Sequence, residues 1–448
     1  MKALTLTCAA AALIACTGGA GAQYYESDTA VGQAVPAEET GDGSGGFYFR
    51  MGGSVGASTL TNPQTQSMQL YNNISLRPET GYGKFALGLD LYADLDSTGR
   101  PRPGEWNSAA DYLRRIWYAR WGHKKDPLYV RLGALPNVTI GHGFIMGGYS
   151  NQARYPDVRT VGLVADADLG FAGFESAVPD INKVNFGGGR VYVRPLRASL
   201  IPLLSDFAIG VTAVVDGNPS GRSGADDKVA VFGLDAEQPL LDREKFSAIL
   251  YADAAMMSLG DRYLNAGSKD HGRGFAAGAN GRLFMFDYRG EIRSMQANFI
   301  PDFFDAYYEI DRNNNGVLKA DAVASSAGPH CTGTLVSLYT SIVEGVRVGA
   351  AYETMDIDTL DIYPRVRAEL TVAPSVLMNR FRLAARYERR NVRNMSDLSH
   401  TRDANTIMTA QAAYLPYPNF EISYTARQTY NEFGQPVTTS QIGTSMKF

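Results

Sequence analysis

The feature that most constrains this chain is an alternation of apolar residues with polar or very small ones, which recurs in short segments along most of its length. Residues 85–92 show it as two faces: Phe85, Leu87, Leu89 and Leu91 against Ala86, Gly88, Asp90 and Tyr92. Residues 286–293 and 420–427 repeat the pattern. Helical spacing would scatter the charged residues of these segments around the whole cylinder, whereas a strand gathers them on one face. The alternation therefore predicts β-strands with one apolar and one polar face.

The same pattern, followed along the chain, gives twenty candidate strands. They fall near 46–58, 66–77, 81–94, 112–122, 127–136, 159–168, 171–179, 187–195, 205–216, 229–238, 246–258, 272–283, 286–297, 332–343, 345–356, 361–373, 379–392, 404–414, 418–429 and 437–448. Each is long enough for a tilted strand to cross a bilayer, which takes ~9–11 residues. We expect an all-β transmembrane antiparallel β-barrel of about 18 to 20 strands, within a range of 16 to 20.

Connection lengths support this topology. If the last strand ends at Phe448 on the periplasmic side, one side of the sheet receives short connections, near 240–245, 285, 344–345 and 415–418. The other side receives long ones, near 95–111, 137–158, 259–271, 298–331 and 393–403. Membrane barrels have short periplasmic turns and long extracellular loops, whereas a soluble β-sandwich shows no such alternation.

The N-terminus has the composition of an export signal. Residues 1–22 contain Lys2, an apolar run and then small residues. Cleavage after Ala22 by the ordinary signal peptidase and lipidation at Cys16 both fit this sequence. Residues 23–45 are acidic, glycine-rich and aperiodic, so we expect a flexible periplasmic arm. The barrel would then occupy residues 46–448.

The export signal, the alternating segments and the terminal aromatic residue Phe448 together resemble a porin-like Gram-negative outer-membrane β-barrel. The last strand of such barrels typically ends in an aromatic residue that the barrel-assembly machinery recognises, so the resemblance makes Phe448 the assembly signal. It implies localisation in the cell outer membrane, contact with outer-membrane lipid and passage of small hydrophilic solutes. A homotrimer is a further expectation from this resemblance. The resemblance indicates no specific porin family. A net charge of -4 gives no case for binding nucleic acid.

Charged residues on the strands are expected to face the lumen, because Arg or Lys facing lipid at the bilayer midplane costs roughly 2–4 kcal/mol. The predicted pore-lining residues are Arg289, Glu291, Arg293, Arg347, Arg365, Arg367, Glu369, Arg382, Arg386, Glu388, Glu421 and Arg427. The arginine surplus has two interpretations. It forms a positive strip that favours anions, or the arginines pair with carboxylates on neighbouring strands and stabilise the wall.

The segment 137–158 is unusually apolar and glycine-rich for an exposed loop. One interpretation is a constriction loop that folds into the lumen, carried by Phe144, Met146, Tyr149 and Arg154. The other is a compact extracellular cap packed on its own apolar residues.

A second long loop contains Asp311, Asn313 and Asn315, followed by Gly316, a spacing that resembles the first half of an EF-hand calcium loop. Position 12 of that pattern is Ala322 rather than Glu, and Asp321 lies one residue early. A Ca²⁺ site at Asp311, Asn313, Asn315 and Asp321 is one hypothesis, and ordinary turn chemistry is the other. No other cofactor is expected.

No nucleophile elbow, phosphate loop or zinc-protease motif is present in the sequence, so no enzyme is expected. The sequence predicts a porin-like channel for passive diffusion of small hydrophilic solutes, with an anion preference as a finer hypothesis. The alternative is a loop-plugged surface-binding or structural barrel, and a barrel enzyme comes third.

Overall fold

The computed structural model describes residues 46–448, apart from 125, 200, 244, 262–270, 297, 326–329, 357–361, 401–402, 404 and 432. The predicted signal peptide (1–22) and N-terminal arm (23–45) lie outside the described residues.

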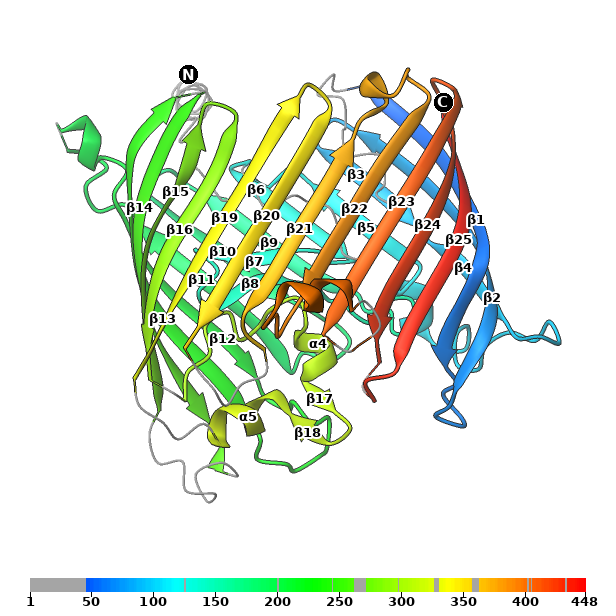
Figure 1. Ribbon diagram of the computed structural model, residues 1–448, viewed down its shortest axis with the longest axis horizontal. Coiled ribbons are helices and arrows are strands. Elements are labelled where there is room, and N and C mark those ends of the chain that lie inside the picture. Colours follow the sequence, from blue (N-terminus) through cyan, green and yellow to red (C-terminus); the bar gives the residue numbers. More distant parts are fainter. Residues whose placement is uncertain are drawn as a thin grey trace, which may run out of the picture.

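Most of the described chain forms the wall of one antiparallel barrel (Figure 1). Its strands are β1 (Phe47–Thr61), β2 (Met68–Tyr82), β3 (Phe85–Leu89), β4 (Leu91–Leu95), β5 (Ile116–Trp121), β6 (Leu128–Gly133), β9 (Gly162–Asp168), β10 (Ala172–Val178), β11 (Phe186–Val193), β12 (Ala208–Asp216), β13 (Val229–Arg243), β14 (Phe246–Leu259), β15 (Gly272–Leu283), β16 (Phe286–Met295), β19 (Cys331–Val343), β20 (Val346–Met355), β21 (Arg365–Val372), β22 (Phe381–Arg389), β23 (Thr406–Tyr417), β24 (Phe420–Tyr430) and β25 (Pro436–Lys447).

The sheet closes on itself because β1 pairs with β2 on one side and with β25 on the other. The sheet has 21 strand segments. Since β3 and β4 are separated only by Asp90 and both pair with β2, they form one interrupted strand of a 20-strand barrel. The predicted fold class and strand number are confirmed.

Two local expectations were wrong. The segment 81–94 is not continuous, because the backbone N–H of Asp90 leaves the ladder and donates to the carbonyl of Arg115 at 2.7 Å. The segment 112–122 begins in a helix rather than a strand. This helix, α2 (Ala109–Leu113), starts at a capping box in which Ser108 and Asp111 satisfy each other's backbone N–H groups.

The two faces of the wall differ as a membrane barrel requires. Val55 and Ile292, at outward positions, are 61% and 66% exposed, whereas the charged residues on either side of Ile292 are buried inside the barrel. An apolar outer band and a polar interior are the arrangement that hydrocarbon outside and water inside favour. Within the described residues, no helix has both the length and the apolar character needed to cross a bilayer.

Short and long connections alternate around the barrel. Turns such as 284–285 and 344–345 lie at the end that carries the C-terminus, while the long loops lie at the opposite end (Figure 1). The longer connection 194–207 at the C-terminal end contains the short 3-10 helix η1 (Pro202–Leu204). The predicted topology is therefore confirmed.

Two long loops carry most of the secondary structure outside the wall. The β6–β9 loop (residues 134–161) contains β7 (Val138–Ile140) and β8 (Met146–Tyr149). The β16–β19 loop (residues 296–330) contains α4 (Tyr308–Asp311), β17 (Asn313–Asn314), β18 (Val317–Leu318) and α5 (Lys319–Ser325), which lie at the end opposite the C-terminus in Figure 1. Among the described residues, the remaining short helices are η2 (Pro374–Val376) and η3 (Met395–Ser399).

Both loops belong to one apolar core inside the barrel. Phe144 and Met146 from the β6–β9 loop and Phe299 and Phe304 from the β16–β19 loop are buried together with inward residues of β9 to β16, such as Val231. Burying these side chains favours the folded loops by roughly 1.5–3 kcal/mol for each large residue. The barrel interior is thus partly filled by its own loops.

Candidate functional site

The structure places all twelve predicted pore-lining residues on the inner wall. Those that are buried are Arg289, Glu291, Arg293, Arg365, Arg386, Glu388 and Arg427. Those that are half-buried are Arg347, Arg367, Glu369, Arg382 and Glu421. They line β16, β20, β21, β22 and β24.

Opposite charges on this wall contact one another. Arg289 Nη2 lies 2.6 Å from a carboxylate oxygen of Glu291, and Arg293 contacts both Glu291 and Glu353. Glu291 lies on the same strand as both arginines, whereas Glu353 lies on β20, on the far side of β19. A buried charge that lost such a partner would be strongly unfavourable, so these contacts hold the wall in one arrangement.

The same pairing continues around β20 to β24. Arg367 and Arg386 both reach Glu388, at 3.3 and 3.6 Å. Arg382 Nη2 lies 2.6 Å from Glu421. These pairs match the ladder interpretation of the arginines.

Arg347 and Arg427 are placed differently. Arg347 lies between Asp287 and Glu369, at 3.7 and 3.6 Å, and its side chain is more exposed than those of the other predicted pore-lining arginines. Arg427 donates to the backbone carbonyl of Gln152, in the β6–β9 loop, at 2.7 Å.

The predicted constriction residues lie inside the barrel. The Phe144 ring packs against Phe299 with a centroid distance of 5.4 Å, and Met146 is fully buried. Tyr149 donates its hydroxyl to Glu309 at 2.6 Å. Arg154 is partly buried, and its backbone carbonyl accepts the N–H of Val158.

The two lumen loops are joined by hydrogen bonds, one between backbone groups and one from a backbone N–H to a carboxylate. The N–H of Asp302 donates to the carbonyl of Phe144 at 2.7 Å, and the N–H of Gly147 donates to Oδ1 of Asp302 at 2.6 Å. A side chain at Gly147 would lie 2.9 Å from that oxygen, so the close approach requires glycine. The loops consequently form one unit inside the lumen.

His142 fastens this unit to the wall. Its ring lies between two carboxylates, with Nδ1 3.0 Å from Asp253 and Nε2 3.2 Å from Glu237, and stacks on Tyr251 at 4.3 Å. Its carbonyl accepts a hydrogen bond from Arg289 at 2.6 Å. A histidine between two glycines, Gly141 and Gly143, is visible in the sequence, but its two carboxylate partners are not.

The far end of the β6–β9 loop is attached to the opposite wall. Asp157 accepts hydrogen bonds from both the N–H and the hydroxyl of Thr61, each at 2.8 Å, and pairs with Arg102 at 2.7 Å. Thr429 donates to the carbonyl of Ala153. The loop therefore crosses the lumen.

A second buried cluster anchors the β16–β19 loop. Asp305 lies between Lys319, at 2.9 Å, and Arg365 of β21, at 2.5 Å. Burial alone would raise the pKa of the Asp305 carboxyl, but the two cations lower it from its ordinary 3.8 to about 2. The strand pattern predicts Arg365 as an inward residue. Asp305 and Lys319 could not be predicted, because no local pattern distinguishes these two residues from solvated charges in a loop.

Three of the four predicted calcium ligands make contacts with protein groups. Asp311 pairs with Arg390, Asn313 donates to the carbonyl of Ser220 at 3.1 Å, and Asp321 accepts the N–H of Leu318 at 2.8 Å. Asn315 adopts a left-handed backbone with φ of 52°, in the turn before Gly316. In the part of the chain that the structure describes, no three His, Cys, Asp or Glu residues gather as metal ligands, and the calcium site stays a prediction.

Phe448 closes the wall. Its N–H donates to the carbonyl of Phe49 at 2.9 Å, and the two rings lie 5.9 Å apart. The Phe448 side chain is 71% exposed, on the rim where β1 meets β25.

Comparisons with known proteins give similarity to solved structures only. No family model matches the chain, and no curated protein sequence matches it. Among solved structures, the chain is similar to Pseudomonas aeruginosa OpdO at 10% identity, covering 90% of this chain and 97% of that one, with a TM-score of 0.35. It is similar to Acinetobacter baumannii OccAB2 at 10% identity, covering 90% and 98%, with a TM-score of 0.34. It is also similar to the outer membrane protein OprD from Pseudomonas aeruginosa at 8% identity, covering 90% and 93%, with a TM-score of 0.34.

The architecture follows from the strand pairing of the chain itself. The wall closes between β1 and β25, apolar residues cover its outside, and ion pairs line its inside. A closed barrel leaves no unpaired strand edge in hydrocarbon, which is the condition for a sheet to span a bilayer. The chain is a closed 20-strand antiparallel β-barrel with the apolar outer face and charged interior of a membrane-spanning barrel.

Proposed function

We propose that this barrel is a passive channel for small hydrophilic solutes. The observation that carries the proposal is the charged and polar inner wall of a closed 20-strand barrel. Side chains alone rarely fill the interior of a barrel of 16 or more strands, so water occupies the remaining space. A water-filled lumen lined by polar groups lowers the barrier for a solute that sheds part of its hydration.

The lumen loops set the width of this channel. The β6–β9 loop crosses from β14 and β16 to β1 and β24, and it is joined to the β16–β19 loop. Solutes would pass beside these loops rather than through an open cylinder. Selection by size is therefore expected to be stringent.

A weak anion preference is the finer proposal. Most wall arginines are engaged by carboxylates, which supports a balanced rather than a strongly positive lumen. Arg347 has the most exposed side chain of the predicted pore-lining arginines, so passing ions would sense its charge more than that of the others.

The test is single-channel conductance of the refolded, signal-less protein in a planar bilayer, with the reversal potential measured under a salt gradient. Stable current steps support the channel, and a reversal potential biased toward anions supports the finer proposal. Arg347→Gln should reduce that bias. Arg380→Gln, in the 373–380 turn, is the control and should leave the bias unchanged.

A loop-plugged binding barrel is the second candidate. The hydrogen bonds that join the two lumen loops to each other and to opposite walls favour it. A folded barrel that passes no current at any salt concentration would support the plugged barrel and end the channel proposal.

Two partners also belong to the proposal. We propose that Phe448 is read by the barrel-assembly machinery, because it stands exposed at the closing edge of the wall. A homotrimer stays a prediction. Analytical ultracentrifugation of the detergent-solubilised protein would distinguish it from a monomer.

A further inference from the structure

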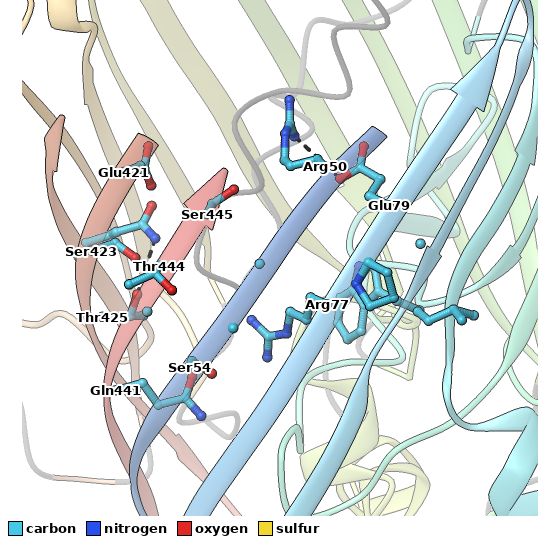
Figure 2. Close-up of a pocket in the computed structure, with 18 of the residues that line it drawn as sticks. Arg50, Ser54, Arg77, Glu79, Glu421, Ser423, Thr425, Gln441, Thr444 and Ser445 are labelled. Atoms are coloured by element: carbon cyan, nitrogen blue, oxygen red, sulfur yellow. Dashed lines mark hydrogen bonds and ion pairs between the residues drawn. The ribbon is translucent and has the colours of Figure 1, made fainter. Parts of the chain in front are cut away.

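A pocket lies on the inner wall where the barrel closes, between the first and last strands. It encloses about 110 Å³ and is lined mainly by β1, β2, β24 and β25. Figure 2 shows Arg50 of β1 and Glu79 of β2 at one end, Ser54 further along β1, and Thr425 and Gln441 on the neighbouring strands β24 and β25. The first pair lies nearer to the end of the barrel that carries the C-terminus.

Glycines at wall positions make room for this pocket. Gly52, Gly88 and Gly443 all line it. A side chain at Gly88 would come within 2.8 Å of the Tyr118 ring, and one at Gly443 within 3.1 Å of Oγ of Ser423. Larger residues at these positions would fill the space that the wall leaves open.

Neutral hydrogen-bonding side chains outnumber the charged side chains in the pocket lining. They are the side chains of Ser54, Gln411, Ser423, Thr425, Gln441 and Ser445. Hydroxyl and carboxamide groups both donate and accept hydrogen bonds. Oγ of Ser54 is buried and has no hydrogen-bond partner among the described residues. Such a group requires water or a ligand as its partner.

The charges that line the pocket are balanced. Two are arginines, Arg50 and Arg77, and two are glutamates, Glu79 and Glu421. Arg50 pairs with Glu79 at 3.4 Å, and Arg77 pairs with Asp90 at 3.1 Å. The pocket therefore offers no net charge to attract an anion or a cation.

The β6–β9 loop borders the pocket. The hydroxyl of Tyr155 lies 3.1 Å from Arg77 and 3.2 Å from Asp90, and its ring meets the pocket residue Trp117 edge to face at 5.5 Å. Trp117 and Tyr155 are both buried, and the part of Trp117 that lines the pocket places an apolar surface beside the hydroxyl and amide groups.

We propose that this pocket binds neutral polyhydroxylated solutes of sugar size on their way through the lumen. The inference rests on the proposed channel and names its substrate class. Ring hydroxyls would exchange hydrogen bonds with Ser54, Gln441 and Thr425, and the apolar ring face would contact Trp117. Ionic solutes gain no net attraction from the balanced charges and lose part of their hydration on entry.

The first test fills the pocket. Ser54→Trp places a large side chain in the pocket. The control, Ser440→Trp, makes the same substitution at an exposed position of β25, directly before Gln441 in the sequence. Efflux of radiolabelled glucose from proteoliposomes should fall at least about fivefold in Ser54→Trp, because the side chain narrows the path. Ser440→Trp should match the original protein.

Heat-modifiable mobility in SDS gels establishes that each barrel is folded. Gln441→Leu serves as the second variant if Ser54→Trp does not fold.

The second test compares three probes of one size and different charge: glucose, gluconate and glucosamine. We expect glucose to leave the vesicles fastest and to change the tryptophan fluorescence of the detergent-solubilised protein, with Trp117→Phe removing most of that change. Gluconate or glucosamine passing as fast as glucose would overturn the proposed substrate class. Equal glucose efflux in Ser54→Trp and Ser440→Trp would overturn the pocket as the route.

The outcomes separate this inference from the channel itself. If the protein conducts ions but Ser54→Trp does not change glucose efflux, the channel proposal stands and the proposed sugar pocket is rejected. A barrel that passes neither ions nor glucose loses the channel. In that case a glucose-dependent change in Trp117 fluorescence would retain the pocket as a binding site, and no change would overturn it as well.

Discussion

Nδ1 of His142 lies 3.0 Å from Oδ1 of Asp253, so a loop residue is fastened to the barrel wall 111 positions further along the chain. Glu237 contacts the other ring nitrogen. If the ring of His142 left the wall, the carboxylates of Asp253 and Glu237 would stay buried without their partner or become exposed to solvent. This contact determines how far one half of the β6–β9 loop can move.

His142→Ala should loosen the β6–β9 loop while leaving the wall folded. Removing one partner from a buried charged contact costs about 3–5 kcal/mol, and here the cost falls on the docked loop rather than on the strand ladders. We expect larger and noisier single-channel steps in a planar bilayer. His400→Ala removes an exposed loop histidine and should change neither property. Identical traces for both variants would show that His142 does not restrain the loop.

Asp305→Asn should release the β16–β19 loop. The substitution leaves Lys319 and Arg365 buried without their shared carboxylate, at a cost of about 3–5 kcal/mol. Limited trypsin digestion of the folded barrel should then cut within this loop at much lower enzyme concentrations. The control is Asp242→Asn, at an exposed position near the end of β13. Unchanged digestion of Asp305→Asn would contradict the anchoring role.

Acid should release the same loop. The pKa of Asp305 is lowered from 3.8 to about 2 in the folded protein, so its stabilisation is complete above pH 4 and is lost as the pH falls toward 2. The shift corresponds to about 2 kcal/mol. Pepsin digestion should accelerate over this range in the original protein. Asp305→Asn should lack that component of the acid dependence, and equal acceleration in both proteins would contradict the prediction.

Replacing Phe448 by Ser should impair assembly more than stability. The side chain is mostly exposed and adds little burial, while the backbone hydrogen bond to Phe49 does not depend on its identity. We expect a several-fold smaller fraction of heat-modifiable, membrane-inserted barrel in cells, with unchanged thermal unfolding of the barrel that does form. Phe381→Ser, at an exposed aromatic position of β22, is the control.

The calcium hypothesis has a direct test. If Asp311 and Asp321 bind Ca²⁺, calcium should slow trypsin cleavage of the β16–β19 loop, and Asp321→Asn should abolish that protection. Asp321 is the better site for substitution because Asp311 also pairs with Arg390. Identical digestion with calcium and with a chelator would exclude the site.

The wall could be predicted from the sequence because each strand carries its own alternation. In β16, Ile292 points outward and Arg289, Glu291 and Arg293 point inward, as the pattern of residues 286–293 indicates. Register shifts in the ladders of β13, β19 and β23 fall near the ends of these strands, so they leave the alternation in the middle intact.

The partners of each charge could not be predicted. That Arg293 meets Glu353 depends on the register of β16 against β19 and of β19 against β20, which no single strand encodes. The break at Asp90 was missed for a similar reason. Its carboxylate is held by Ser75 of β2, Arg77 of β2 and Tyr155 of a distant loop, and alternation reports none of these contacts.

The attachments of the β6–β9 loop have a consequence for the closure of the cylinder. The carboxylate of Asp157 accepts a hydrogen bond from Thr61 at the end of β1. The backbone carbonyls of Gln152 and Ala153 accept hydrogen bonds from Arg427 and Thr429 of β24. β25 lies between these two strands, so one short stretch of chain ties together both flanks of the line where the first and last strands meet. The loop thereby acts as an internal brace against lateral opening of the barrel, and it can dock fully only after the final strand is in place.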